Sequence, residues 1–271
     1  MTFAEHIEPQ DNAGVGLGFT DRWGGVSSPP YDDFNLGVIG RDRPQAVATN
    51  AERLRTAIGC RGLAMTAQTH GADVRLVTAQ SELVSPAWFE GGFQPPVADA
   101  MVTTEPGIGL VIRVADCVPV LLADLGRGVV AAAHAGRVGL LAGVLEQTVA
   151  VMKDQGAVEL VAWIGPHIGP ECYEVPSEMA AAAWRQLPAT RARSARGTPA
   201  IDLGAGAAAV LAGLGADVRR LDPCTACVPD FFSHRRDRGL TGRSAGVIWR
   251  SGLPGRVAAA GTTPAASLEP Y

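Results

Sequence analysis

Apolar residues recur along the chain in two periods, and these periods predict a mixture of strands and helices. Spacings of three and four residues predict helices over residues 44–58, 137–156, 177–187 and 202–214, with Gly59 and Gly156 as stop signals. Short alternating or continuous apolar runs predict strands, two of them around Gly71, two within 98–124, and one each near 128–136, 159–169, 216–221 and 244–250. The sequence shows neither an internal repeat nor a linker, so we expect one mixed α/β domain over residues 1–256.

The segments between these runs predict loops. Residues 15–40 are rich in Gly, Pro and Asp, as expected of a functional or covering loop. Residues 81–98 are interrupted by Pro and Gly, and the Arg/Ala/Ser-rich stretch 188–199 is expected to be mobile. The Ala/Pro/Thr-rich residues 257–271 predict a flexible tail.

Composition excludes several classes of protein. Hydrophobic residues make up 47% and charged residues 18% of the chain, as is usual for soluble globular proteins. The net charge of −4 predicts no nucleic-acid partner. No uninterrupted apolar run reaches the roughly 18 residues of a membrane span. The acidic N-terminal segment has no signal-peptide pattern, and five cysteines are an odd number, so we expect reduced thiols and a cytoplasmic location.

Cys117 and His134 stand at opposite ends of a predicted β-hairpin, "CVPVLLADLGRGVVAAAH". If Asp124 pairs with Gly128, then Cys117 and His134 lie within one residue of directly opposite each other. Opposed Cβ atoms in such a ladder are about 4.5–5.5 Å apart, although a slip of one residue would turn one side chain to the other face. The hairpin thus predicts that a thiol and an imidazole meet.

His70, in "AQTHGADV", is a third candidate, which only the fold could bring to this pair. Two His and one Cys leave one position open on tetrahedral zinc, as in catalytic zinc sites. The alternative is a metal-free Cys117 thiolate activated by His134, with Asp99 or Asp116 orienting the imidazole. The residues alone leave both chemistries open, and a buried Cys or His can also be a plain core residue.

Six segments, in order, resemble the signature blocks of the YfiH-like family. They are "FTDRWGGVSSPPYDDFNLG", "AQTHGADV", "ADAMVTTEPGIGLVIRVADCVPVLL", "AAAHAGRVGLLAGV", "IGPHIGPECYEV" and "FFSHRRDRGLTGR", and the resemblance covers about residues 17–249. Members are also known as laccase-domain or polyphenol oxidase proteins, purine nucleoside phosphorylases and peptidoglycan editing factors. The resemblance implies an α+β fold, a four-layer α/β/β/α sandwich with mixed β-sheets.

The resemblance also implies an activity and a metal. It implies zinc held by His70, Cys117 and His134, phosphorolysis of adenosine, inosine and methylthioadenosine, and adenosine deamination at the same site. Copper is the weaker implication, because copper oxidase sites need more histidine ligands and five histidines are few for several copper ions. Remaining alternatives are a cysteine-dependent hydrolase or amidase that edits peptidoglycan precursors, a copper-dependent polyphenol oxidase, and a non-catalytic nucleotide- or partner-binding module.

Purine nucleoside and phosphate are the expected small-molecule partners. Guanidinium groups bind phosphate in a bidentate manner, and Gly136 and Arg137 begin a predicted helix whose N-terminus favours an anion. The candidates for phosphate are Arg22, Arg137, Arg235, Arg236 and Arg243, and those for ribose or base are Asn35, Gln68 and His234.

Three residues depart from the family pattern. His167 stands where a small residue is more usual and predicts an extra imidazole in the site, Ala207 replaces an expected Asn, and His234 replaces a common Tyr. The CxxC formed by Cys224 and Cys227 lacks a second CxxC or a His pair nearby in the sequence, so it is weak as a zinc motif.

Overall fold

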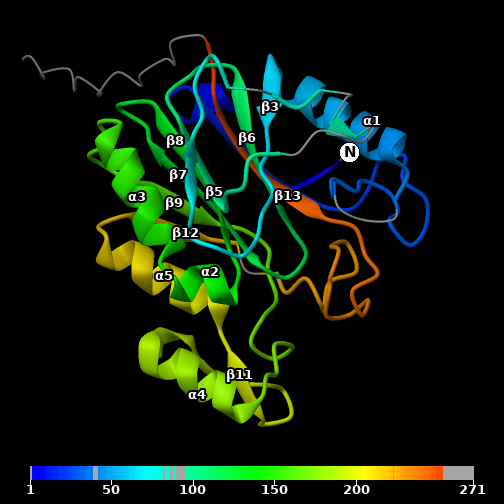
Figure 1. The fold of residues 1–271 in the computed structure, drawn as a ribbon, viewed down its shortest axis with the longest axis vertical. Helices are drawn as coiled ribbons and strands as arrows, with labels where there is room; N and C mark the ends of the chain where they lie inside the picture. The colour runs from blue at the N-terminus through cyan, green and yellow to red at the C-terminus, as the bar shows by residue number, and fades with distance from the viewer. Residues whose placement is uncertain are drawn as a thin grey trace, which may run out of the picture.

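Two β-sheets packed face to face form the centre of the fold, and helices cover their outer faces (Figure 1). The computed structural model describes residues 2–38, 42–81, 83–85, 88–89, 95–221 and 223–252. The predicted tail 257–271 lies outside the described residues.

The first sheet has five strands in the order β1-β2-β13-β6-β3. Their bounds are β1 Phe3–Ile7, β2 Val15–Thr20, β13 Ser244–Arg250, β6 Ile108–Val114 and β3 Gly62–Ala64. Neighbouring strands are antiparallel except β3 and β6, which are parallel.

The second sheet has six strands in the order β12-β9-β7-β8-β5-β4. Their bounds are β12 Asp217–Arg220, β9 Val161–Ile164, β7 Val118–Asp124, β8 Val129–Ala135, β5 Ala100–Thr103 and β4 Val74–Leu76. The outer pairs β12–β9 and β4–β5 are parallel and the inner pairs antiparallel, so both sheets are mixed, as predicted.

Successive side chains of a strand point to opposite faces of its sheet, so alternate residues of the central strands pack against different layers. On β8, Val130 and Ala132 face the first sheet, whereas Val129 and Ala131 face helices. The helices on that side are α2 Arg137–Leu141, α3 Val144–Asp154, α4 Ser177–Gln186 and α5 Leu203–Gly213. Helix α1, Pro44–Ala57, covers the outer face of the first sheet. The predicted α+β class and the order α/β/β/α are thereby confirmed.

Some predicted elements were wrong in detail. Residues 15–40 begin with the buried strand β2, whose glycines lie under aromatic rings: a Cβ on Gly16 would be 2.2 Å from the Trp249 ring. The helix predicted over 137–156 is two helices, α2 and α3, separated at Gly143, whose φ of 89° is left-handed. The stretch 98–124 holds three strands, β5, β6 and β7, rather than two.

The stretch 188–199, predicted to be a mobile loop, contains regular secondary structure. A 3₁₀ turn at Pro188–Thr190 leads into β10, Arg191–Arg193, which pairs with β11, Pro199–Ile201. Among the described residues, no helix combines the length and the apolar character needed to traverse a bilayer.

Candidate active site with a His–Cys–His group

The register of the β7–β8 hairpin determines whether Cys117 and His134 can meet. The observed ladder pairs Asp124 with Val129 and Pro119 with His134, one residue away from the predicted pairing of Asp124 with Gly128. The predicted register was therefore wrong. It would have placed Cys117 and His134 on opposite faces of the sheet. In the observed register His134 is opposite Pro119, two residues after Cys117, and both side chains reach the same face.

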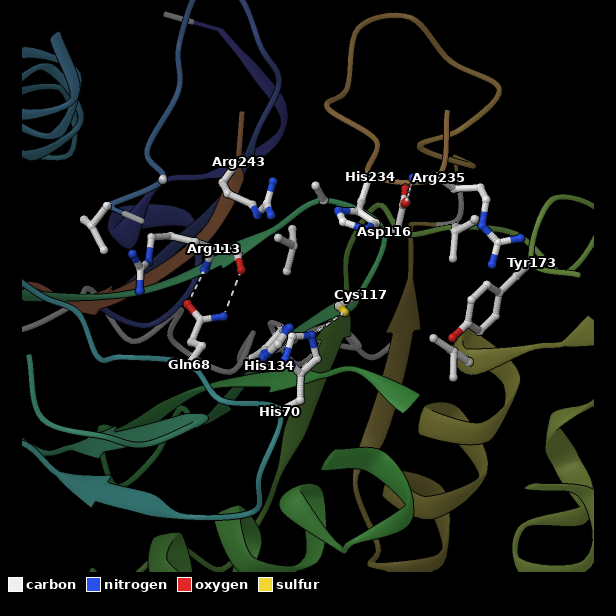
Figure 2. Close-up of a pocket in the computed structure, with 16 residues that line it drawn as sticks. Gln68, His70, Arg113, Asp116, Cys117, His134, Tyr173, His234, Arg235 and Arg243 are labelled. Atoms are coloured by element: carbon white, nitrogen blue, oxygen red, sulfur yellow. Dashed lines mark hydrogen bonds between the residues drawn. The ribbon is translucent and has the colours of Figure 1, made fainter. Parts of the chain in front are cut away.

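His70 joins this pair from the segment that leads to β4 (Figure 2). The Cys117 Sγ lies 3.7 Å from the His70 Nε2, and the rings of His70 and His134 meet edge to face with centroids 4.8 Å apart. One ligand atom from each of the three residues lies within 4.8 Å of the other two. The structure therefore brings together the three side chains that the sequence indicated.

Asp99, fully buried just before β5, holds both histidines in place. Its Oδ1 accepts hydrogen bonds from the His134 Nδ1 at 2.8 Å and from the His70 amide at 2.9 Å, and its Oδ2 accepts the Gly71 amide at 2.7 Å. His70 has a left-handed φ of 63°, a conformation that these bonds help to hold. With Nδ1 engaged, the Nε2 of His134 is left as the ligand atom.

The charges of the group favour a thiolate. Burial alone raises the pKa of Cys117, but the adjacent His134 and His70 outweigh burial and lower it to about 6. Burial alone lowers the pKa of His134, but Cys117 and Asp99 outweigh it and raise that pKa to about 9. Without a metal, the pair is therefore a thiolate beside an imidazolium at neutral pH.

Gly136, the residue before α2, leaves room for the group. A Cβ at this position would lie 2.8 Å from the His70 Cδ2 and 3.0 Å from the Cys117 Sγ, so no larger residue fits without displacing them. The start of α2 can approach the His–Cys–His group this closely only because the side chain is absent.

The donor set fits a thiophilic divalent ion. A thiolate and two imidazoles are ligands that zinc prefers, and a carboxylate behind a ligating imidazole is the usual support for such a ligand. The group opens onto a cavity of about 430 Å³, a size typical of small-molecule sites. His70, Cys117 and His134 could hold a metal there while leaving one side open to a ligand.

Two guanidinium groups line the cavity on the first sheet, facing the His–Cys–His group on the second (Figure 2). Arg113 ends β6 and Arg243 directly precedes β13, and these are neighbouring strands. Burial, together with the charge of the nearby Arg243, lowers the pKa of Arg113 to about 10. The Arg113 Nε is buried without a hydrogen-bond partner, and neither guanidinium forms an ion pair within the described parts of the chain.

Tyr173, His234 and Arg235 form the opposite wall of the cavity (Figure 2). The Arg235 guanidinium lies 5.1 Å from the centre of the Tyr173 ring. Asp116, with a left-handed φ of 90°, accepts the Thr225 hydroxyl at 2.7 Å and the Arg235 amide at 2.6 Å. Asp116 therefore fixes this wall, whereas Asp99 is the residue that orients His134.

The remaining predicted residues divide into two groups. Gln68, His234, Arg235 and Arg243 line the cavity, whereas Arg22, Asn35, Arg137 and Arg236 are absent from its lining. The Gln68 side-chain Nε2 donates to the Arg113 carbonyl at 2.8 Å and its Oε1 accepts the Arg113 amide at 3.0 Å, so Gln68 positions that residue.

Some of the residues outside the lining support it. The Asn35 Oδ1 accepts the Arg243 amide at 2.8 Å, and Arg137 lies beside the Tyr173 side chain. The Arg22 Nε donates to the Asp32 carbonyl at 2.8 Å and its guanidinium stacks over Phe232, so it holds a loop.

One expectation about the departures from the family pattern was wrong. His167 does not line the cavity: its Nδ1 lies 2.8 Å from the Gly165 carbonyl, and its ring packs against Gly204 at the start of α5. Ala207 is buried in the core, so no side chain reaches the cavity from that position.

Sequence reasoning missed Arg113 and Tyr173 as cavity residues. Arg113 lies within an apolar strand run, "GLVIRVAD", and a charged residue in a buried strand was the signal that could have identified it.

The chain is similar to proteins of known sequence and structure over most of its length. The family model described as multi-copper polyphenol oxidoreductase laccase matches residues 16–251. Purine nucleoside phosphorylase SCO2081 of Streptomyces coelicolor is 47% identical over 87% of this chain and 96% of its own length. Purine nucleoside phosphorylase YfiH of Escherichia coli is 37% identical over 87% and 94%. The crystal structure of the hypothetical protein YfiH from Bacillus licheniformis superimposes with a TM-score of 0.79, at 29% identity over 88% of this chain and 93% of that one. The chain thus belongs to the laccase-like family that includes YfiH.

Proposed function

We propose that this protein is a zinc-dependent purine nucleoside phosphorylase that accepts adenosine, inosine and methylthioadenosine and also deaminates adenosine at the same site. The observation that carries the proposal is the pair of guanidiniums, Arg113 and Arg243, facing the His–Cys–His group across one cavity. The names of the relatives from Streptomyces coelicolor and Escherichia coli support it.

Phosphate is the ligand that suits the guanidinium pair. Arg113 and Arg243 are buried or half-buried cations that form no ion pair within the described residues. Burial lowers the pKa of each guanidinium, and the charge of Arg243 also contributes to the lowered pKa of Arg113, as expected of two cations that repel each other. A phosphate between them would satisfy the buried Arg113 Nε and relieve the repulsion. Phosphorolysis needs an anion held against the ribose, and this pair supplies its binding site.

The nucleoside would occupy the space between the arginines and the opposite wall. Burial raises the pKa of Tyr173, and the charge of Cys117 raises it further, so its hydroxyl stays protonated and can donate a hydrogen bond to base or ribose. His234 and Arg235 lie on the same wall and offer further donors.

His70, Cys117 and His134 would hold the zinc. A zinc ion supplies Lewis-acid chemistry, which polarises substrate oxygen atoms and lowers the pKa of water, as deamination requires. Asp99 keeps His134 in the tautomer whose Nε2 can ligate. Copper in several sites is a poorer fit, because the only other potential metal group within the described residues consists of three cysteines.

The decisive experiment is an assay of base release with and without phosphate. Release of adenine from adenosine, or of hypoxanthine from inosine, that requires phosphate and yields ribose 1-phosphate supports the proposal. Base release that is independent of phosphate contradicts it. Conversion of adenosine to inosine without phosphate tests the deaminase activity separately.

A cysteine-dependent hydrolase or amidase acting on peptidoglycan precursors is the second candidate. It is favoured by the lowered pKa of Cys117, since a thiolate beside two imidazoles is also the arrangement of a nucleophile. Stoichiometric zinc that is lost in His70→Ala supports the phosphorylase. A metal-free enzyme inactivated by iodoacetamide at Cys117 supports the hydrolase.

A further inference from the structure

A second group of potential metal ligands lies apart from the His–Cys–His group. The fold brings Cys172 next to the CxxC of Cys224 and Cys227, and the three sulfurs lie within 4.8 Å of one another. Cys172 and Cys227 are 55 residues apart in sequence, yet their Sγ atoms are 3.2 Å apart. None of these cysteines lines the cavity of the proposed active site.

The geometry points to a zinc site built from Cys172, Cys224 and Cys227, with an oxygen ligand in the fourth position. Thiolates around tetrahedral zinc lie about 2.3 Å from the ion and hence about 3.8 Å from each other. Here the Cys172 and Cys227 sulfurs are 3.2 Å apart and no pair of the three sulfurs exceeds 4.8 Å, so small side-chain adjustments would reach that spacing. Three converging thiols select a thiophilic ion such as zinc over Mg²⁺ or Ca²⁺. The fourth ligand is water or the carboxylate of Glu171, which lies beside Gly169.

The backbone around Cys224 is arranged for a thiolate. The Gly169 amide donates to the Cys224 Sγ at 3.2 Å, and the Cys227 amide donates to the Cys224 carbonyl at 3.1 Å, which closes the CxxC turn. The Gly169 N–H, which is aimed at the Cys224 sulfur, would support a ligating thiolate as an outer partner of a metal site.

The proposed ion would join the segment that carries Tyr173, a residue of one cavity wall, to the segment that supports Asp116 from behind that wall. Cys172 precedes Tyr173, and Cys224 precedes Thr225, whose hydroxyl bonds to Asp116. The same region is also held by a β-bridge between His167 and Cys224. In addition, the Arg235 guanidinium donates a hydrogen bond to the Cys172 carbonyl at 3.3 Å. The site is therefore structural, because it fixes the position of a wall without touching the cavity.

Metal content tests the proposal without any assay of activity. Wild-type protein, produced with zinc and purified under a reducing agent, is analysed for metal together with Cys227→Ser and Cys172→Ala. We expect each variant to hold one equivalent of zinc less than the wild type. Cys227 is exposed, so Cys227→Ser is expected to fold normally, as circular dichroism can verify. Cys60→Ala is the matched control, because Cys60 is buried in another part of the core and should not change the zinc content.

Cadmium titration of the chelator-treated proteins gives a second readout. Thiolate-to-cadmium charge-transfer absorbance should fall in Cys227→Ser and Cys172→Ala relative to wild type, and remain unchanged in Cys60→Ala. Equal zinc content in wild type and Cys227→Ser would overturn the proposal. So would a Cys172–Cys227 disulfide, detected by mass spectrometry in reduced preparations, with no zinc at this position. Neither result bears on nucleoside phosphorolysis, so failure here and failure of the proposed function are distinguishable.

Discussion

The buried Asp99 carboxylate lies 2.8 Å from the Nδ1 of His134 and thereby fixes which ring nitrogen faces the cavity. The same oxygen accepts the His70 amide, so one carboxylate controls two of the three proposed metal ligands. Asp99→Asn should lower zinc affinity about 10- to 100-fold, as expected for loss of an outer partner of a metal ligand. Competition with a chromophoric chelator measures the effect. The exposed Asp73, in the same region, provides the control Asp73→Asn, and equal affinity in both variants would refute this role for Asp99.

Cys117→Ser tests the thiolate itself. A serine hydroxyl is a poor zinc ligand, so we expect the variant to lose the zinc bound by His70 and His134 and to lose both phosphorolysis and deamination. Metal analysis and the two activity assays measure this on one preparation. Turnover close to wild type in Cys117→Ser would contradict the assignment.

Gly136→Ala tests the close approach of α2. The new Cβ would collide with the His70 ring and the Cys117 sulfur, so the variant should bind zinc more weakly while its far-ultraviolet circular dichroism stays unchanged. Gly213→Ala, in open space at the end of α5, is the matched control and should bind zinc as the wild type does. A crystal structure of Gly136→Ala with all three ligands undisturbed would argue against the steric explanation.

Arg113→Gln and Arg243→Gln test the phosphate site. Each substitution removes a charged donor, so KM for phosphate should rise about tenfold to a hundredfold, and phosphorolysis should fall more than deamination. Arg22→Gln is the comparison, because Arg22 is absent from the cavity lining and its loss should lower stability without raising KM for phosphate. If KM for phosphate rose in Arg22→Gln but not in Arg113→Gln or Arg243→Gln, the phosphate site would not be at Arg113 and Arg243.

Asp124 links stability to pH at the far end of the hairpin. Its carboxylate accepts the amides of Val158 at 2.6 Å, Arg127 at 2.8 Å and Glu159 at 3.0 Å. Burial raises the pKa of Asp124, but these bonds outweigh burial and lower it. A lowered pKa in the folded protein means that the stabilisation is complete above the ordinary aspartate pKa and is lost as pH falls through the lowered value.

Asp124→Ala should therefore reduce the free energy of unfolding by about 2–3 kcal/mol at pH 7. The difference from wild type should shrink at pH 3 and below, where wild-type Asp124 also begins to protonate. Urea denaturation at both pH values measures this. A difference that is constant with pH would show that the carboxylate charge plays no part.

The spacing of apolar residues predicted most helices and strands, because that spacing can be read within a short window of sequence. Helix α1 and the β7–β8 hairpin were identified in this way, and the family resemblance added the order of the layers. Tertiary contacts decided the exceptions. Strand β2 looks like a loop because its glycines make space for the rings of Trp249 and Phe3, and such pairing across strands is not visible in a window of sequence.

The site was only partly predictable for the same reason. The residues indicated His70, Cys117 and His134, but only the fold shows that they meet. Arg113 was missed because it interrupts an apolar strand. Its proposed role depends on Arg243, which directly precedes the neighbouring strand but stands 130 positions later in the chain. Cys172 was likewise separated from the CxxC that it joins.

The proposed metal ligands lie on or next to strands of one sheet, and the proposed phosphate ligands on or next to strands of the other. The apolar layer between the sheets therefore sets the distance between the two groups of ligands. Side chains such as Phe19 and Leu121 act as spacers, although neither reaches the cavity. Changes of volume in that layer would shift one half of the reaction centre against the other, and a bound reactant would in turn clamp the two sheets together.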